Sequence, residues 1–334
     1  MIATIALPAM PGNEAPRQRR VSVRSADELR KAMQHARHGA LAVDASGLDR
    51  VLRLDATRQL LEVQAATPWS ALIDYLAGSA PELSQLLTDD GLPATVAESV
   101  TMNVPTPDGR PLSAHIEALA LVSAEGELRR ASRDSNPELF ALAVGGQGVF
   151  GIPYSVTLRV ASLRQSCAAP RPEAKLEHGV ARSRAESELT LLLPPERLDA
   201  LLTRMREQTA EWRVPIVSAA ARRTLAEDET FLRWARCEYA HLRLRLATPP
   251  GLGGRVRAAQ ARRELIEMAI TEGGGVTPAG LFDASPEQAE TCYPQLKAFL
   301  AEKRRLDPGD RLYNAWYRHA RGLLSRDTVA VRWG

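Results

Sequence analysis

A dense run of glycines has the residue types and spacing best suited to binding chemistry in this chain. Four glycines fall within seven positions, between a helix-like segment and an alternating strand. They are Gly145, Gly146, Gly148 and Gly151, followed directly by Ile152. Without Cβ atoms, such a loop lets another group approach the backbone closely and permits positive φ angles. The run therefore either cradles a cofactor with its backbone N–H groups or forms a tight helix-to-strand junction, and the residues alone leave both interpretations open.

The histidines and cysteines do not suggest a metal centre. The six histidines are scattered, without the short spacings of a metal-binding helix. The three cysteines, Cys167, Cys237 and Cys292, lie too far apart in the sequence for a metal motif and are odd in number. We expect no bound metal and no disulfide framework.

The overall composition is that of a soluble globular protein, with 334 residues, 45% of them hydrophobic, and a formal net charge of +3. This length suffices for two domains with cores of their own. No stripe of basic and aromatic residues indicates a nucleic-acid surface, and no apolar run approaches the roughly 20 residues of a membrane span. The N-terminus lacks the basic region of a signal peptide. We expect no nucleic-acid partner, no membrane span and a cytoplasmic location.

The hydrophobic pattern predicts two α+β units in tandem around the glycine run. In the first unit, a capping box at Ser25–Glu28 begins a helix that ends near Gly39. A second helix of this unit follows Pro68. Strands are expected at 41–44, 51–55 and 60–65 in the first unit, and at 116–123, 127–131 and 154–160 in the second.

A different pattern follows a linker rich in Pro, Arg and Glu. Helices are expected at 196–209, 255–272 and 285–303. Between them, the segment 239–246 alternates, with leucines on one face and His241, Arg243 and Arg245 on the other. This alternation predicts an antiparallel sheet with helices on one side. The polar face either binds an anionic substrate or is simply solvated.

This order of units resembles the FAD-linked oxidases of the vanillyl-alcohol oxidase superfamily, which share the PCMH-type FAD-binding fold. The chain is most similar in pattern to the decaprenylphosphoryl-ribose oxidases and the sugar-lactone oxidases. The resemblance covers roughly residues 20–165 and 225–323. The segments that carry it are Leu54-Asp55, Leu61–Ala66, Pro137–Phe140, Gly145–Ile152, Tyr293–Leu296, Leu306–Pro308 and Trp316–His319.

The resemblance implies an α+β fold in four parts. The parts are an FAD-binding-like domain at 1–165 with subdomains at about 20–80 and 92–165, a linker at 166–186, a cap or substrate domain at 187–284, and a C-terminal helical segment at 285–334. The cap domain is expected to be an antiparallel sheet with helices on one side, and the last segment to return to the first domain.

The resemblance also implies a non-covalently bound FAD. It gives cofactor-binding roles to Thr95, Asn103 and His115, and to the glycine run with Ile152. Two of these residues have simpler explanations, because Asn103 could cap a turn and His115 could be a hydrogen-bonded structural group at the start of a strand.

The phosphate-binding segments depart from the family pattern. The segment Gly39–Val43 joins helix to strand without the family's glycine-rich phosphate loop, and Glu98 stands where the family has a glycine. A carboxylate about 4 Å from a pyrophosphate oxygen would be repelled by about 4 kcal/mol at an effective dielectric near 20. These departures open the alternative that FAD binding is weak or lost.

Two functions follow, with a third left open. The first is an FAD-dependent oxidoreductase acting on an alcohol carbon of a sugar-like or hydroxylated small molecule. The second is a flavin-free pseudoenzyme that acts as a binding or accessory protein, with an oxidoreductase as partner. A non-redox enzyme that reuses the old flavin cavity is the third, and no residue argues for it.

No catalytic base is evident from the sequence. The segment Gly273–Phe282, which corresponds to the family's substrate-facing strand, has no titratable side chain. Tyr317 and His319 in the closing segment are the only catalytic candidates, and both could equally belong to the aromatic core.

Overall fold

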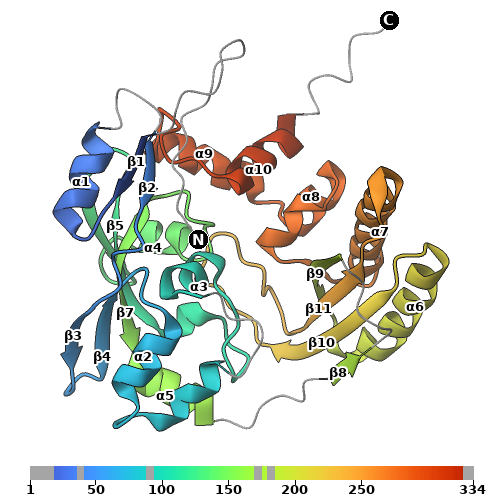
Figure 1. Ribbon diagram of the computed structural model, residues 1–334, viewed down its shortest axis with the longest axis horizontal. Helices are drawn as coiled ribbons and strands as arrows, with labels where there is room; N and C mark the ends of the chain where they lie inside the picture. The colour runs from blue at the N-terminus through green and yellow to red at the C-terminus, as the bar shows by residue number, and fades with distance from the viewer. Residues whose placement is uncertain (1–18, 36–40, 88–93, 169–174, 179–184, 326–334) are drawn as a thin grey trace, which may run out of the picture.

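The computed structural model describes residues 19–35, 41–87, 94–168, 175–178 and 185–325. Within these ranges the chain is built from helices and antiparallel sheets. The α+β fold class expected from the sequence is therefore confirmed. Figure 1 shows two sheet regions side by side, with a group of C-terminal helices lying across the top of both.

The first sheet has five strands in the order β3-β4-β7-β5-β6, and every neighbouring pair is antiparallel. Its strands are β3 (Val51–Asp55), β4 (Leu60–Gln64), β5 (Ile116–Val122), β6 (Leu128–Ser132) and β7 (Ile152–Arg159). The helices that accompany it are α2 (Trp69–Leu76), α3 (Val96–Met102), α4 (Pro137–Ala143) and α5 (Val160–Ala168), with 3-10 turns η2 (Pro81–Leu87) and η3 (Leu112–His115). Strand β7, which follows the glycine run, lies at the centre of the sheet, and most of its residues are buried.

A small parallel pair precedes this sheet. Strands β1 (Arg19–Ser22) and β2 (Leu41–Asp44) pair in register around helix α1 (Ala26–His35). Helix α1 buries Leu29 and Met33 in a separate hydrophobic cluster that also holds Val43. The helix end expected near Gly39 lies outside the described residues.

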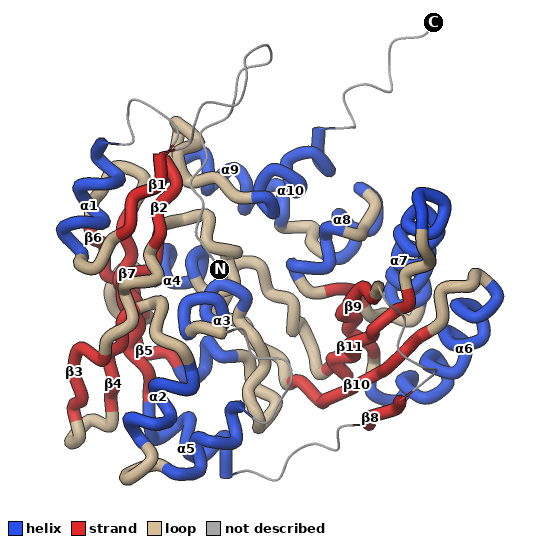
Figure 2. The backbone as a smooth tube through the Cα atoms, in the orientation of Figure 1, coloured by secondary structure: helices blue, strands red, loops and turns tan. Residues whose placement is uncertain are grey.

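The second sheet has the order β12-β9-β11-β10-β8 and is also antiparallel. Its strands are β8 (Lys175–His178), β9 (Glu186–Leu193), β10 (Ile216–Thr224), β11 (Tyr239–Ala247) and β12 (Gly275–Val276). Helices α6 (Leu198–Glu211) and α7 (Gly251–Thr271) cover one face, as Figure 2 also shows. The leucines of β11 are buried beneath them, at Leu242, Leu244 and Leu246. The alternation read from the sequence is therefore confirmed.

Several elements differ from the sequence-based expectation. Helix α5 ends inside the range 166–186 that was expected to be linker, and the short strand β8 also lies in that range. The single helix expected at 285–303 is two helices, Pro286–Cys292 and Leu296–Leu306. Strand β8 exists because its backbone pairs with the edge of β10. Such pairing is made between segments far apart in sequence, so local composition does not reveal it.

The C-terminal segment is helical and contacts the preceding part of the chain. It contains α8 (Pro286–Cys292), α9 (Leu296–Leu306) and α10 (Ala315–Ser325), and it follows the 3-10 turn η5 (Pro278–Phe282). A capping box at Ser285 and Gln288 begins α8. Trp316 on α10 donates from Nε1 to the carbonyl of Pro278 at 2.7 Å, and its ring meets Phe299 edge-on.

A buried ion pair fixes the turn after α9. Lys303 is 0% exposed, and its Nζ lies 2.5 Å from a carboxylate oxygen of Asp307. The same carboxylate accepts hydrogen bonds from the backbone N–H groups of Arg311 and Leu312. Burial lowers the pKa of Lys303, while Asp307 opposes that shift.

We expect Lys303→Met to lower the free energy of unfolding by about 3–5 kcal/mol, because it leaves the Asp307 carboxylate buried without its cation. Chemical denaturation measures the loss. Lys297→Met is the matched control, since Lys297 lies on the same helix and is exposed, and it should change stability by less than about 0.5 kcal/mol. Equal losses in the two variants would contradict the role of the ion pair.

Candidate functional site

Helix α3 lies at the centre of the predicted cofactor site. Thr95 is its N-cap residue, and its side-chain oxygen accepts a hydrogen bond from the backbone N–H of Glu98 at 3.3 Å. The Glu98 carboxylate in turn accepts from the N–H of Thr95 at 3.4 Å. The two residues therefore form a capping box. The Glu98 side chain thus turns back to the start of its own helix. This residue, which stands where the resemblance expects a glycine, has a local structural role.

The first backbone donors of α3 all have partners within the chain. The N–H of Val96 donates to the carbonyl of Thr67 at 3.0 Å, and that of Ala97 donates to the carbonyl of Ala65 at 2.9 Å. The third, at Glu98, donates to Thr95. A helix N-terminus binds phosphate through N–H groups that have no intrahelical partner. In this chain the N–H groups are bound instead by the carbonyls of Ala65 and Thr67, which follow β4, and by the hydroxyl of Thr95.

The glycine run is pinned to the other end of α3. The N–H groups of Gly145 and Gln147 donate to the carbonyls of Val100 and Thr101, each at 2.9 Å. The N–H of Gly146 donates to the carbonyl of Ala143 at the end of α4, and that of Val149 donates to the carbonyl of Gly146 within the loop. On the far side of the loop, Asn314 donates from Nδ2 to the carbonyl of Gln147 at 2.8 Å. The loop thus connects α3 to the C-terminal helices.

Close packing accounts for the glycines. A Cβ on Gly146 would lie 1.8 Å from the carbonyl oxygen of Leu142, and one on Gly151 would lie 2.3 Å from the Leu121 side chain. Gly145 and Gly148 have φ angles of +71° and +72°, which L side chains rarely adopt. The sequence left open whether the glycine run holds a cofactor or forms a tight helix-to-strand junction. The contacts of the run are those of a tight junction. Ile152, the next predicted residue, is buried at the start of β7.

Asn103 ends helix α3 in the left-handed conformation, with φ +49°. Its Oδ1 accepts from the N–H of Ser113 at 2.8 Å, and its carbonyl accepts from Nε1 of Trp234 at 3.2 Å. Its Nδ2 and the Oγ of Ser113 are buried without a hydrogen-bond partner among the described residues. Asn103 therefore caps the C-terminus of a helix, in line with the structural one of its two sequence interpretations.

His115 holds three segments together. Its Nδ1 lies 2.7 Å from Oγ of Ser162 on α5, and its Nε2 lies 3.0 Å from Oγ1 of Thr106. Asp108 stands 3.8 Å from the same Nε2. Burial would raise the pKa of the Asp108 carboxyl, but hydrogen bonds from His115 and Thr106 outweigh it and hold the pKa well below its usual range. The ring is 1% exposed, so its contacts are those of a structural histidine.

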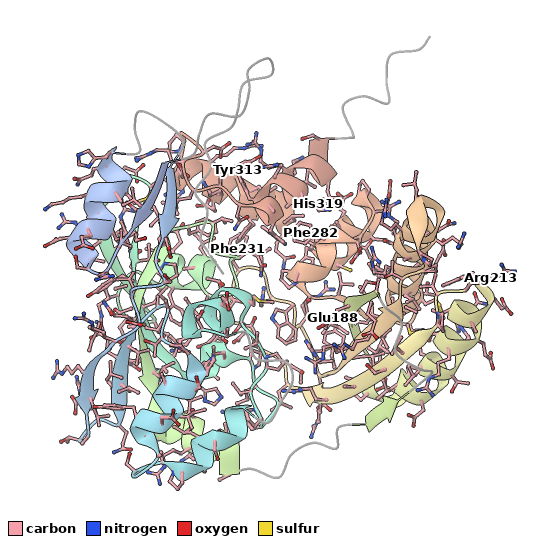
Figure 3. All side chains as sticks on the ribbon, viewed as in Figure 1. Glu188, Arg213, Phe231, Phe282, Tyr313 and His319 are labelled. Atoms are coloured by element: carbon pink, nitrogen blue, oxygen red, sulfur yellow. The ribbon has the colours of Figure 1, made fainter. Side chains whose placement is uncertain are left out.

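The two catalytic candidates lie in the C-terminal helices. The Tyr317 hydroxyl donates to Asp310 at 2.6 Å, and burial together with that carboxylate raises the pKa of Tyr317 to about 12. Nε2 of His319 lies 2.8 Å from the carbonyl oxygen of Leu281, and the His319 ring lies at an oblique angle to that of Phe282. Figure 3 labels both residues. The hydrogen bonds of both side chains are made to residues 281 and 310, and not to Asn103 or the glycine run.

A segment that the sequence did not single out crosses between the two sheets. We call residues 225–238, which connect β10 to β11, the strap. Its Leu225 N–H donates to the carbonyl of Gly109, and its Phe231 N–H donates to the carbonyl of Ala141 on α4. The Glu229 carboxylate accepts from Nε and Nη2 of Arg133, whose guanidinium also donates to the carbonyls of Ser113 and Ile116.

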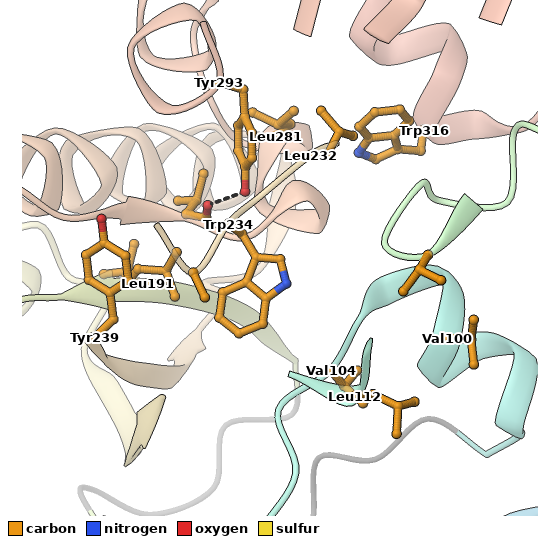
Figure 4. Packing of buried hydrophobic residues seen from close by; sticks show 14 of the residues in the cluster. Val100, Val104, Leu112, Leu191, Leu232, Trp234, Tyr239, Leu281, Tyr293 and Trp316 are labelled. Carbon is orange, nitrogen blue, oxygen red and sulfur yellow. Dashed lines mark hydrogen bonds between the residues drawn. The ribbon is translucent and has the colours of Figure 1, made fainter. Parts of the chain in front are cut away.

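Trp234 is the buried residue of the strap that joins the two regions. Its side chain is 3% exposed and bonds to Asn103. In Figure 4 the indole lies between Leu191 of the second sheet and Val104 and Leu112 beside the first. In the sequence, this contact is indicated by the apolar residues Phe231, Leu232, Trp234 and Ala235 within an otherwise charged loop. The strap brings protein atoms to the residues where the resemblance placed a flavin.

The polar face of the second sheet also meets Trp234. His241 lies directly opposite Arg222 in the β10–β11 register, and its ring centroid is 5.7 Å from that of Trp234. Burial lowers the pKa of His241 to about 3, assisted by the charges of Arg222 and Arg243. Part of the residue still reaches solvent, yet the ring is enclosed by protein atoms and cations, so we expect it to be neutral at pH 7.

Of the comparisons with known proteins, only that with solved structures finds a likeness. No protein-family model matches the chain, and no curated protein matches it in sequence. Among solved structures, Physcomitrella patens BBE-like 1, as wild type and as a variant, superimposes with a TM-score of 0.59 at 11% identity, covering 88% of this chain and 89% of the other. At that identity the likeness is one of fold. The chain thus has a BBE-like FAD-binding fold.

Among the described residues, no group of three or more His, Cys, Asp or Glu side chains is placed to hold a metal ion. No helix in the same described ranges is long and apolar enough to cross a bilayer.

We expect Gly146→Ala to destabilise the protein by roughly 2 kcal/mol or more, because the new methyl group would collide with a backbone carbonyl. Gly322→Ala is the opposite case, since Gly322 lies within α10 with nothing near its Cβ position. It should stabilise by up to about 1 kcal/mol through helix propensity. Thermal and urea unfolding measure both, and a neutral Gly146→Ala would argue against the packed junction.

The depressed pKa of His241 predicts a pH-dependent stability. Below about pH 6.5 the histidine of the unfolded chain binds a proton, whereas the folded one stays neutral until about pH 3. Acid therefore favours unfolding throughout this interval. Between pH 6.5 and 5, where carboxylates titrate little, wild type should lose stability more steeply than His241→Gln. Parallel curves from urea unfolding would contradict the assignment.

Proposed function

We propose that this chain is a flavin-free protein with the fold of the FAD-linked oxidases, and that it functions by binding. The observation that carries the proposal is the state of the backbone donors around α3. The N–H groups of Val96, Ala97 and Glu98 at its start, and of Gly145 and Gln147 at its end, already donate to atoms of the chain. An FAD pyrophosphate would have to compete for each of them.

The competition is unfavourable on simple grounds. Each internal hydrogen bond contributes about 0.5–1.5 kcal/mol to stability, and a buried carbonyl left without its donor costs about 1–3 kcal/mol. Freeing several donors to form an oriented nest for phosphate would therefore cost several kilocalories per mole before any ligand contact is made. The residues at this site do not fit the cofactor's pyrophosphate, so we derive no redox step through it.

A binding role agrees with the other features of the site. His115, Tyr317 and His319, the titratable residues singled out from the sequence, each hold a structural hydrogen bond. The strap occupies the region beside Asn103 with a tryptophan. We propose an accessory protein of the cytoplasm that binds a small molecule and works with an oxidoreductase as partner.

An FAD-dependent oxidoreductase acting on an alcohol carbon of a sugar-like small molecule is the second candidate. The observation that favours it is the unsatisfied pair of Asn103 Nδ2 and Ser113 Oγ, both buried beside the glycine run. The BBE-like fold supports the same candidate. In this case the flavin would be held non-covalently, and the strap would have to move.

The test is direct. We expect the purified protein to be colourless, to leave the fluorescence of added FAD unchanged, and to show no rise in melting temperature with FAD, because a ligand that binds only the folded state must raise it. A yellow protein with close to one FAD per chain would overturn the proposal and establish the second candidate.

The variant Glu98→Gly separates two obstacles to FAD binding, the Glu98 carboxylate and the occupied N–H groups of α3. We expect it to weaken the α3 cap, at a cost of about 0.5–2 kcal/mol, without producing FAD binding, because the N–H groups of Val96 and Ala97 keep their carbonyl partners. Thr95→Ala is the matched control, since it removes the other half of the same capping box. FAD binding by Glu98→Gly alone would show that the carboxylate is the obstacle.

A further inference from the structure

The outer side of the strap faces a cavity of about 970 Å³. This volume is at the upper end of the range typical of small-molecule sites. Three segments far apart in sequence meet there; the lining includes Ala141 of α4, residues 226–231, 233 and 236 of the strap, and Pro294 and Gln295 between α8 and α9. None of the cofactor-site residues singled out from the sequence lines it. Figure 3 shows Phe231 of the strap in the region between the two sheets.

Internal hydrogen bonds hold the strap in one shape. The Glu227 carboxylate accepts from the N–H groups of Glu229 and Thr230 at 2.9 and 3.0 Å, and from the Thr230 hydroxyl. The Glu227 N–H donates across the loop to the carbonyl of Ala235. Beneath it, Phe231 packs on Phe299 of α9. A wall fixed in this way loses little conformational entropy when a ligand binds.

The charges on this wall divide into those used by the fold and those left for a ligand. Glu227 is occupied by its own turn, and Glu229 is neutralised by Arg133. Arg233 and Asp228 are exposed and make no ion pair or side-chain hydrogen bond with any described residue. Arg236 is also exposed, and its guanidinium interacts with the Tyr239 hydroxyl. Arg233 and Arg236, three positions apart, both line the cavity, and so does the Asp228 carboxylate.

We propose that this cavity binds a small organic anion, whose carboxylate or phosphate is held by Arg233 and Arg236. Guanidinium groups bind such oxyanions through two parallel N–H donors. Asp228 accepts from a hydroxyl group of the same ligand and disfavours anions of high charge. The proposal rests on the binding function proposed above and names the site and ligand class for it.

The experiment is a calorimetric titration of the full chain at low salt with two probes, inorganic phosphate and malate, a hydroxydicarboxylate. We expect saturable binding of at least one, and the stronger probe identifies whether phosphate or carboxylate is the preferred head group. Arg233→Ala and Arg236→Ala should each weaken that binding about tenfold or more, as expected for loss of a charged hydrogen bond.

Arg257→Ala is the matched control, because Arg257 is exposed on α7, does not line the cavity, and carries the same charge. It should weaken binding less than twofold. Asp228→Asn should tighten the binding of phosphate, which has little to gain from the carboxylate. Circular dichroism melts of each variant verify that the fold is retained.

Absence of saturable binding for both probes would overturn the proposal, as would an equal loss in Arg257→Ala, which would indicate only general attraction of anions to a basic protein. These outcomes are independent of the FAD test. A colourless protein that binds neither probe would refute the cavity alone, whereas a yellow protein would refute the flavin-free function whatever the probes do.

Discussion

The backbone hydrogen bonds at the two ends of helix α3 are the interaction on which the rest of this structure depends. At its start, carbonyls of Ala65 and Thr67 accept the first helical N–H groups, which ties α3 to the strand end after β4. At its end, carbonyls of Val100 and Thr101 accept N–H groups of the glycine run, which leads into the central strand β7. Since buried backbone groups must be paired, these bonds fix the sheet, the helix and the loop as one unit.

The strap extends this unit to the second sheet. Its bonds to Asn103, Ala141 and Gly109 come from one short connection between β10 and β11, and the Arg133–Glu229 pair adds a charged link. In a fold built to enclose a cofactor, a bound ligand can supply much of the contact between the two parts. Here Trp234 and its neighbours supply it, and the outward face of the same strap is left with its arginines toward solvent.

The sequence singled out several of these residues but could not assign their partners. Thr95 and Asn103 were recognised by their place in a family pattern, and both cap α3, which a local pattern can indicate. The four glycines indicated that another group packs closely against the backbone. In the structure that group belongs to the chain itself, at Leu142 and Leu121. Tyr317 and His319 were chosen for their chemistry, and their hydrogen bonds to Asp310 and Leu281 depend on how the last helix packs.

The sequence by itself determined the α+β class, the alternation of β11 and the helix start at Ser285. All of these follow from periodicity, from cap residues or from residue-by-residue comparison with a pattern, and so they are local. Only the tertiary structure decided that the backbone N–H groups around α3 are already hydrogen-bonded within the chain, that the strap reaches Asn103, and that Arg233 and Arg236 line a cavity. The reason is physical: whether an N–H group or a guanidinium is available depends on which distant carbonyl or carboxylate the fold brings within about 3 Å of it.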